Sequence, residues 1–166
     1  MQAETIAYVF GAGHRILMAN LAGVSQEESL MCARETANGI NWLAGHILNS
    51  RGRLARMLGA GGPFLTERES TYYGRGSRPI HAGDPCADLG QLADGLRESA
   101  EKISARLATI TGAELDAEID LKLFPIPPEN PTVAAMVTFL VFHEAYHNGQ
   151  IGLNRRAIGK VSGIGV

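Results

Sequence analysis

Two histidines near the C-terminal end of the chain stand at a spacing that can bind a metal ion. Residues 143–147 read HEAYH, which fits the H-E-x-x-H pattern of zinc metalloproteases. On a helix, His143 and His147 lie on one face with about 6 Å between their Cβ atoms, so both can ligate one ion. Glu144 lies about 100° further around that helix. It is therefore either a general base beside the metal or a side chain directed toward a neighbouring helix.

A catalytic zinc site needs a third protein ligand, and the sequence provides none downstream. No His, Asp or Glu follows His147. Zincin-like peptidases take their third ligand from that side, so a peptidase is disfavoured. The upstream candidates are His14, His46 and His81. His46 is favoured because it lies in the middle of a mainly apolar helical stripe, and facing helices of a bundle can present inward side chains at one level.

Further polar and aromatic residues lie on the faces that carry these histidines. Gln150 follows His147 by one turn, and we expect it to hold that ring or to contact a substrate. Arg53 lies two turns beyond His46, where it can bind a substrate carboxylate or extend into solvent. Trp42 is a further candidate for supporting the site or contacting a substrate, although we expect it to belong to the core rather than to form a platform for substrate. We expect the cluster Arg51, Arg53 and Arg56 to be a solvated face.

The composition excludes several classes of protein. The chain has 166 residues, a net charge of -2, 45% hydrophobic and 19% charged residues, which is ordinary for a globular protein and gives no reason to expect a nucleic-acid partner. Two cysteines, Cys32 and Cys86, form no disulfide framework and suit a cytoplasmic location. We expect no signal peptide and no membrane span, since the longest apolar run falls short of the roughly 20 residues that a span requires.

Helical periodicity predicts an all-α protein, specifically a four-helix bundle that forms a single domain over residues 1–166. A rival interpretation of residues 6–16 as a strand that enters a dinucleotide-binding loop is much weaker, because Ile16 replaces the third glycine of that fingerprint. Residues 60–85, rich in Gly, Pro, Ser and Arg, are expected to form a long irregular connection between the second and third helices. The four expected helices cover residues 4–23, 36 or 38 to 58, 87–110 and 131–158.

Local signals predict where some helices begin. Ser25 and Glu28 can form a capping box for a short turn. Asn130 is expected to be the N-cap of the last helix and Pro131 its first residue, after an extended proline-rich approach over residues 123–131.

Two segments of the sequence resemble the DinB-like (DinB/YfiT) superfamily: NWLAGHILNSR around His46, and HEAYHNGQIGLNRRAIG near the C-terminus. Hallmarks of that family are a histidine in the second helix and an H-x-x-x-H-x-G-Q-[IL] run in the fourth. The resemblance implies a four-helix bundle of up-down-down-up type, often a homodimer. It also implies a divalent metal ion, whether nickel, zinc, iron or manganese, held by His46, His143 and His147.

The same resemblance sets the expected function. Characterised relatives include thiol S-transferases that use bacillithiol and mycothiol-dependent enzymes such as maleylpyruvate isomerase, while many members have no known reaction. The resemblance therefore implies a metal-dependent enzyme, similar to a thiol S-transferase or a hydrolase, acting on a small molecule with or without a low-molecular-weight thiol as cosubstrate. The alternative is a non-catalytic metal-binding or stress-response bundle, and a bundle with hydrogen-bonded core histidines and no metal also stays open.

Overall fold

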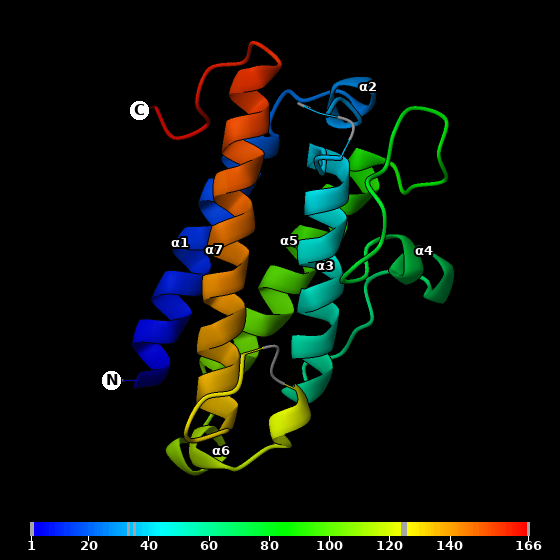
Figure 1. Ribbon diagram of the computed structural model, residues 1–166. Coiled ribbons are helices and arrows are strands. Elements are labelled where there is room, and N and C mark those ends of the chain that lie inside the picture. The colour runs from blue at the N-terminus through cyan, green and yellow to red at the C-terminus, as the bar shows by residue number, and fades with distance from the viewer. Residues whose placement is uncertain (1, 33, 35, 124–125, 166) are drawn as a thin grey trace.

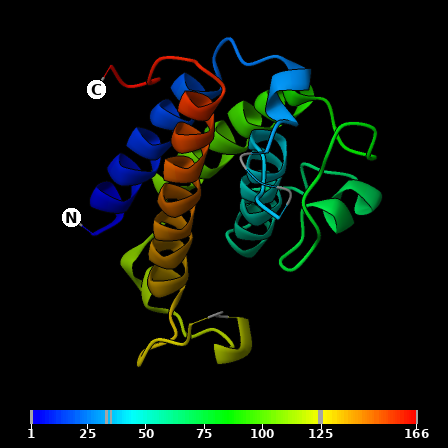
Figure 2. The ribbon, with the colours of Figure 1, turned by 45° about the horizontal axis from the view of Figure 1, so that its top comes forward.

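The computed structural model describes residues 2–32, 34, 36–123 and 126–165, and this part of the chain is helical without a strand, as predicted (Figure 1). Four long helices form the bundle, with α1 and α7 running in one direction and α3 and α5 in the other (Figures 1 and 2). None of the described helices is both long and apolar enough to cross a lipid bilayer. The elements are α1 (Gln2–Leu21), α2 (Gln26–Ser29), α3 (Ile40–Met57), α4 (Glu67–Tyr72), α5 (Leu89–Leu107), α6 (Gly112–Asp116), η1 (Leu121–Leu123) and α7 (Val133–Ala157).

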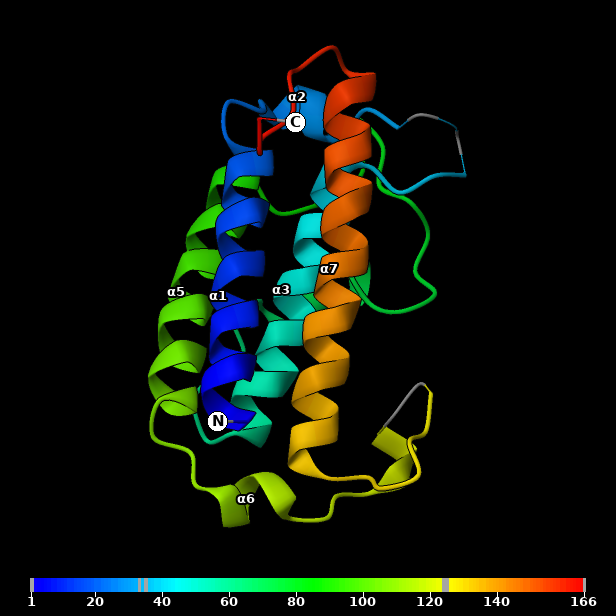
Figure 3. The same cartoon turned by 90° about the vertical axis from the view of Figure 1, so that its left-hand side faces the viewer.

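Two apolar clusters build the core, one toward each end of the bundle. One includes Leu43 of α3 and Leu92 of α5, and the other includes Leu54 of α3 and Ile103 of α5. Helix α7 packs against both α1 and α3 (Figure 3) and contributes Ile151 to the first cluster and Val137 to the second. Burial of such apolar surface stabilises the bundle by about 25 cal/mol per Å². The stretch of α7 between its two core contacts carries the histidine motif, so the polar residues lie at a layer between the clusters.

The short helices α2 and α4, which lie in the connections, both begin at capping boxes, and only the box of α2 was predicted. The predicted box is present at α2, where the Ser25 hydroxyl accepts from Glu28 N and the Glu28 carboxylate accepts from Ser25 N. The prediction of an irregular segment over 60–85 was wrong for residues 67–72, which form α4. Thr66 and Glu69 make the same reciprocal pair there, a T-x-x-E signal that is visible in the sequence.

The start of α7 also differs from the prediction. Thr132, not Asn130, is its N-cap, because the Thr132 hydroxyl accepts from Ala135 N at 3.2 Å. The peptide groups on either side are held in extended pairing with residues 117–119, through Ile119 N to Pro131 O at 2.8 Å and Val133 N to Ala117 O at 3.0 Å. That pairing prevents Pro131 from beginning the helix. Residues 124 and 125 of the expected extended approach lie outside the described part.

Candidate metal centre

The three predicted histidines come together between α3 and α7. The Nε2 atom of His143 lies 3.1 Å from Nε2 of His46 and 3.1 Å from Nε2 of His147. One ligating atom from each ring falls within 4.8 Å of the others, so the set can hold a metal ion. His46 is buried and His143 is partly buried. The upstream alternatives His14 and His81 do not join this group.

The hydrogen bonds at the far side of two rings determine where their protons are. His46 Nδ1 lies 2.7 Å from the Tyr73 carbonyl oxygen, and His147 Nδ1 lies 2.7 Å from Oε1 of Gln150. Both oxygens are acceptors, so each Nδ1 carries the hydrogen and each Nε2 presents a lone pair. His143 Nε2 faces both lone pairs but can donate a hydrogen to one only. A divalent cation among the three nitrogens would satisfy all of them, so the donor set fits a metal.

Electrostatics keep these rings neutral, which is the form that binds metals. Burial lowers the pKa of His46 and of His147, while it lowers the pKa of His143 from 6.5 to about 4 with smaller contributions from the neighbouring rings and Arg53. The Nδ1 of His143 is also a buried nitrogen without a hydrogen-bond partner among the described residues. Three neutral imidazoles suit zinc, copper, iron or nickel. With three protein ligands, a tetrahedral ion keeps an open position.

The ring of His46 is fixed from two sides. Trp42 stacks on it, with the ring centroids 4.7 Å apart and the planes at 11°, and Trp42 Nε1 donates to the Ser77 hydroxyl at 2.9 Å. Trp42 is buried as part of the core, as expected. Tyr73, whose carbonyl accepts from His46, is fully buried, and its ring occupies the space above Gly45, where any Cβ would clash with it. The connection between α3 and α5 thus supplies partners for a histidine on α3.

Aromatic and cationic side chains surround the other rings. The Tyr146 ring lies 5.2 Å from the His147 ring, and the Phe139 ring lies 6.2 Å from that of His143. Arg53 is exposed and donates to the Ser50 hydroxyl at 3.2 Å. No carboxylate among the described residues forms an ion pair with Arg53. Its predicted role in substrate binding stays a prediction.

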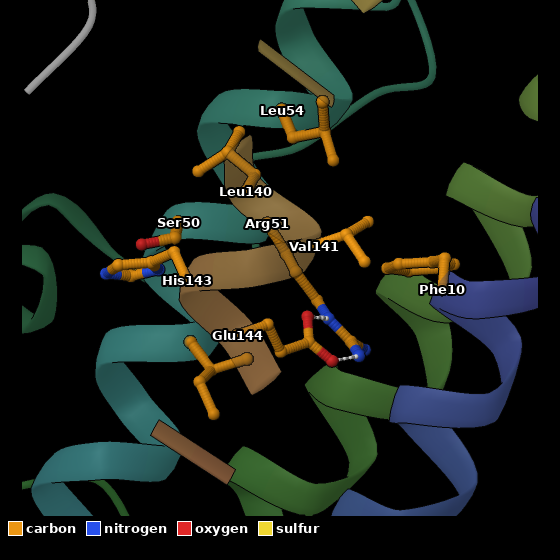
Figure 4. Close-up of a pocket in the computed structure, with 9 residues that line it drawn as sticks. Phe10, Ser50, Arg51, Leu54, Leu140, Val141, His143 and Glu144 are labelled. Carbon is orange, nitrogen blue, oxygen red and sulfur yellow. Dashed lines mark hydrogen bonds and ion pairs between the residues drawn. The ribbon is translucent and has the colours of Figure 1, made fainter. Parts of the chain in front are cut away.

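Glu144 points away from the histidines and into the bundle. Figure 4 shows His143 and Glu144 on different sides of α7, with the Arg51 guanidinium alongside the carboxylate. Arg51 Nε donates to Glu144 Oε2 at 2.8 Å, and Arg51 Nη2 donates to Oε1. The structure thus favours the interpretation in which Glu144 faces a neighbouring helix, and its role as a general base is untested.

The interpretation of the basic cluster as a solvated face was wrong for Arg51, which is only 2% exposed. A signal for its burial existed in the sequence. Arg51 stands four residues after Ile47 and three before Leu54, both of which belong to the core. Residues at these spacings share a helix face, so the apolar stripe of α3 passes through Arg51.

Comparisons with known proteins agree with the fold and identify a family. The sequence profile of the DinB superfamily matches residues 14–151. The fold is similar to that of a conserved protein from Enterococcus faecalis whose crystal structure is known, with a TM-score of 0.67, 17% sequence identity, and coverage of 93% of this chain and 95% of that one. No curated protein matches the sequence. At this identity the structural match concerns the fold alone, while the profile spans all three histidines.

Proposed function

This chain belongs to the DinB superfamily, and on that premise we propose that it is a metal-dependent enzyme, similar to a thiol S-transferase or a hydrolase. The observation that carries the proposal is the meeting of the three Nε2 atoms, with 3.1 Å between His143 and each of the other two rings. A centre that served only the fold would satisfy its polar atoms with one another, as most buried groups in native proteins do.

His46, His143 and His147 would hold the divalent ion, whether nickel, zinc, iron or manganese. Neutral imidazoles leave the ion its charge, and an ion so bound lowers the pKa of a coordinated water or thiol. The protein's own contribution is orientation. The Tyr73 carbonyl and Gln150 fix which nitrogen of His46 and His147 faces the centre, and such partners commonly change metal affinity by about 10–100-fold when they are removed.

The surroundings of the centre favour a small substrate with an anionic group. Arg53 has no carboxylate partner among the described residues, and its charge acts on both His46 and His143. Arginine binds carboxylates through paired hydrogen bonds. Phe139 and Tyr146 add apolar surface beside the rings. A small carboxylic acid, or a low-molecular-weight thiol that carries a carboxylate, fits these neighbours.

One observation favours the non-catalytic alternative, a metal-binding or stress-response bundle. Glu144 is the carboxylate next in sequence to the centre, and both of its oxygens are occupied by Arg51. An enzyme of this type would therefore depend on the metal and on its substrate, rather than on Glu144, for proton transfer. Turnover by the metal-loaded protein separates the two alternatives.

We also propose that the chain forms a homodimer. Helix α7 exposes three large apolar side chains, with relative exposures of 65% for Phe142, 60% for Tyr146 and 62% for Leu153. They recur at spacings of four and seven residues, which places them on one side of the helix. A second copy would remove this apolar stripe from water.

The first experiment measures metal and mass together. Protein purified without a metal-affinity tag is passed through size-exclusion chromatography with light scattering and elemental analysis. We expect a metal ion on each chain of a dimer, and its loss in His46→Ala and in His143→Ala. His81→Ala is the matched control and keeps its metal. Full metal content in both ligand variants would contradict the proposed site.

The second experiment tests the substrate. Cobalt-loaded protein is titrated with mercaptoacetate and with 2-mercaptoethanol, which both offer a thiol but differ in the carboxylate. We expect mercaptoacetate to bind about fivefold more tightly, since an exposed ion pair contributes up to about 1 kcal/mol, and Arg53→Gln to abolish the difference. Equal binding of the two thiols to the wild type would reject the anionic substrate. Conjugation of thiols to chlorinated acceptors and hydrolysis of esters then test for turnover.

A further inference from the structure

Each histidine of α7 is followed by a buried polar residue that binds another helix. Glu144 follows His143 and is 6% exposed, and Asn148 follows His147 and is 4% exposed. Successive residues lie about 100° apart around a helix, so the histidines face the candidate centre while Glu144 and Asn148 face the core. Asn148 Nδ2 donates to Gly13 O of α1 at 3.1 Å. The same motif therefore provides ligands on one face and anchors on the next.

The anchor at Glu144 joins all four long helices at the level of the centre. Its partner Arg51 comes from α3, and Arg51 Nη1 donates to Leu96 O of α5 at 2.8 Å and to the Ser99 hydroxyl of α5 at 3.3 Å. The guanidinium carbon lies 4.9 Å from the centre of the Phe10 ring of α1. Arg51, Glu144 and His143 all line a small cavity of about 10 Å³, and Figure 4 draws these lining side chains.

We propose that the Arg51–Glu144 pair is a positioning device, which fixes the rotation of α7 relative to α3 so that the His143 ring meets the ring of His46. The inference rests on the proposed function, because it concerns the same three-histidine centre. Glu144 would thus act by positioning His143 and would not take part in the reaction.

Geometry explains why rotation of α7 matters. An imidazole nitrogen lies well outside the helix cylinder, which has a radius of about 2.3 Å, so turning the helix by ~20° displaces that nitrogen by roughly 2 Å. Metal–ligand distances tolerate only about 0.2 Å. Arg51 donates to both oxygens of one carboxylate, and a two-point contact of this kind has one preferred orientation. Apolar side chains at the same positions would fill the space but permit several rotations.

The test replaces both partners with apolar residues of similar volume, in the variant Arg51→Met/Glu144→Leu. Removal of both charges of a buried pair is often tolerated by the fold. We expect cooperative thermal unfolding, at least tenfold weaker zinc affinity in competition with a chromophoric chelator, and an altered visible spectrum of the cobalt form. A folded double variant with wild-type zinc affinity and an unchanged cobalt spectrum would overturn the inference.

Arg155→Met is the matched control. Arg155 is a buried arginine of α7, the helix that carries Glu144, and it donates to Asn20 O, Ala22 O and Val161 O. We expect it to lower the unfolding temperature while zinc affinity stays within twofold of wild type. An equal loss of affinity in this control would mean that general destabilisation explains the effect, and would overturn the inference as well.

A second variant decides the question if the double variant does not fold. Glu144→Gln keeps the shape of the side chain and one acceptor, but it gives up the charged two-point contact. We expect a folded protein with about threefold weaker zinc affinity, and unchanged affinity would reject the positioning role. A wild type that binds none of zinc, nickel, iron and manganese would overturn the proposed function and the inference together, whereas equal affinities in wild type and variants overturn the inference alone.

Discussion

Helix α7 carries two polar clusters on adjacent faces, and they differ in how well their hydrogen-bonding groups are satisfied. On the inner face, both oxygens of Glu144 accept from Arg51, and Arg51 also donates to α5. On the outer face, His143 Nδ1 has no partner within the described structure, and Nε2 lone pairs converge. Buried polar groups are rarely left unsatisfied without a reason. The inner cluster is thus complete as folded, whereas the outer one leaves hydrogen-bonding nitrogens unsatisfied.

The largest effect is expected from breaking the complete cluster. Glu144→Leu leaves the Arg51 charge buried without its counter-ion, which costs about 3–5 kcal/mol of unfolding free energy. Urea denaturation of the metal-free protein measures it. Glu98→Leu is the control, because Glu98 pairs with Lys102 on the surface and its loss costs less than about 1 kcal/mol. Similar losses in both variants would remove the distinction between a buried and an exposed pair.

The incomplete cluster should respond in the opposite direction. In chelator, we expect His143→Leu to leave the unfolding free energy unchanged or to raise it by about 1 kcal/mol, because a buried nitrogen without a partner is removed. With excess zinc we expect the wild type to have the higher unfolding free energy of the two, since zinc binding stabilises the folded wild type. Denaturation in chelator and in zinc measures both. A loss of several kcal/mol in chelator would show that His143 is already satisfied without metal.

A smaller effect is expected from pH. The pKa of His143 is lowered from 6.5 to about 4 by burial. The unfolded chain therefore takes up a proton at this residue near pH 6.5, while the folded chain does so only near pH 4. Stability of the metal-free protein should fall as the pH is lowered through this window. Thermal unfolding from pH 7.5 to 4.5 measures the slope, which should be shallower in His143→Leu, and identical slopes would contradict the assignment.

The outer cluster could largely be predicted from the sequence. His143 and His147 stand four residues apart on a helix, and His46 lies in an apolar stripe, so periodicity alone places the three rings inside a bundle. The helices themselves follow from the same periodicity and from capping residues such as Ser25. Periodicity does not give the relation between helices. The apolar stripe around His46 favoured it over His14 and His81, and the family resemblance implied the same choice, but neither gives the distances between the rings.

The inner cluster was harder to predict for a physical reason. A charged residue can be predicted to be buried only if its counter-ion is known, and Arg51 and Glu144 are far apart in the sequence. Arg51 stands among exposed arginines, so its neighbours suggested solvent even though the spacing to Ile47 and Leu54 indicated the core. The H-E-x-x-H pattern indicated a general base at Glu144. In this chain the glutamate of that pattern lies on the internal face of α7 and pairs with Arg51.

The packing of Tyr73 over Gly45 has a consequence for anyone who would transplant this centre into another scaffold. Copying the three histidines onto a plain bundle with short turns would omit the carbonyl that orients the ring of His46. The connection between α3 and α5 is largely irregular, yet shortening it would remove the hydrogen bond that orients the His46 ring. A transplanted centre must therefore include this connection and a glycine at position 45.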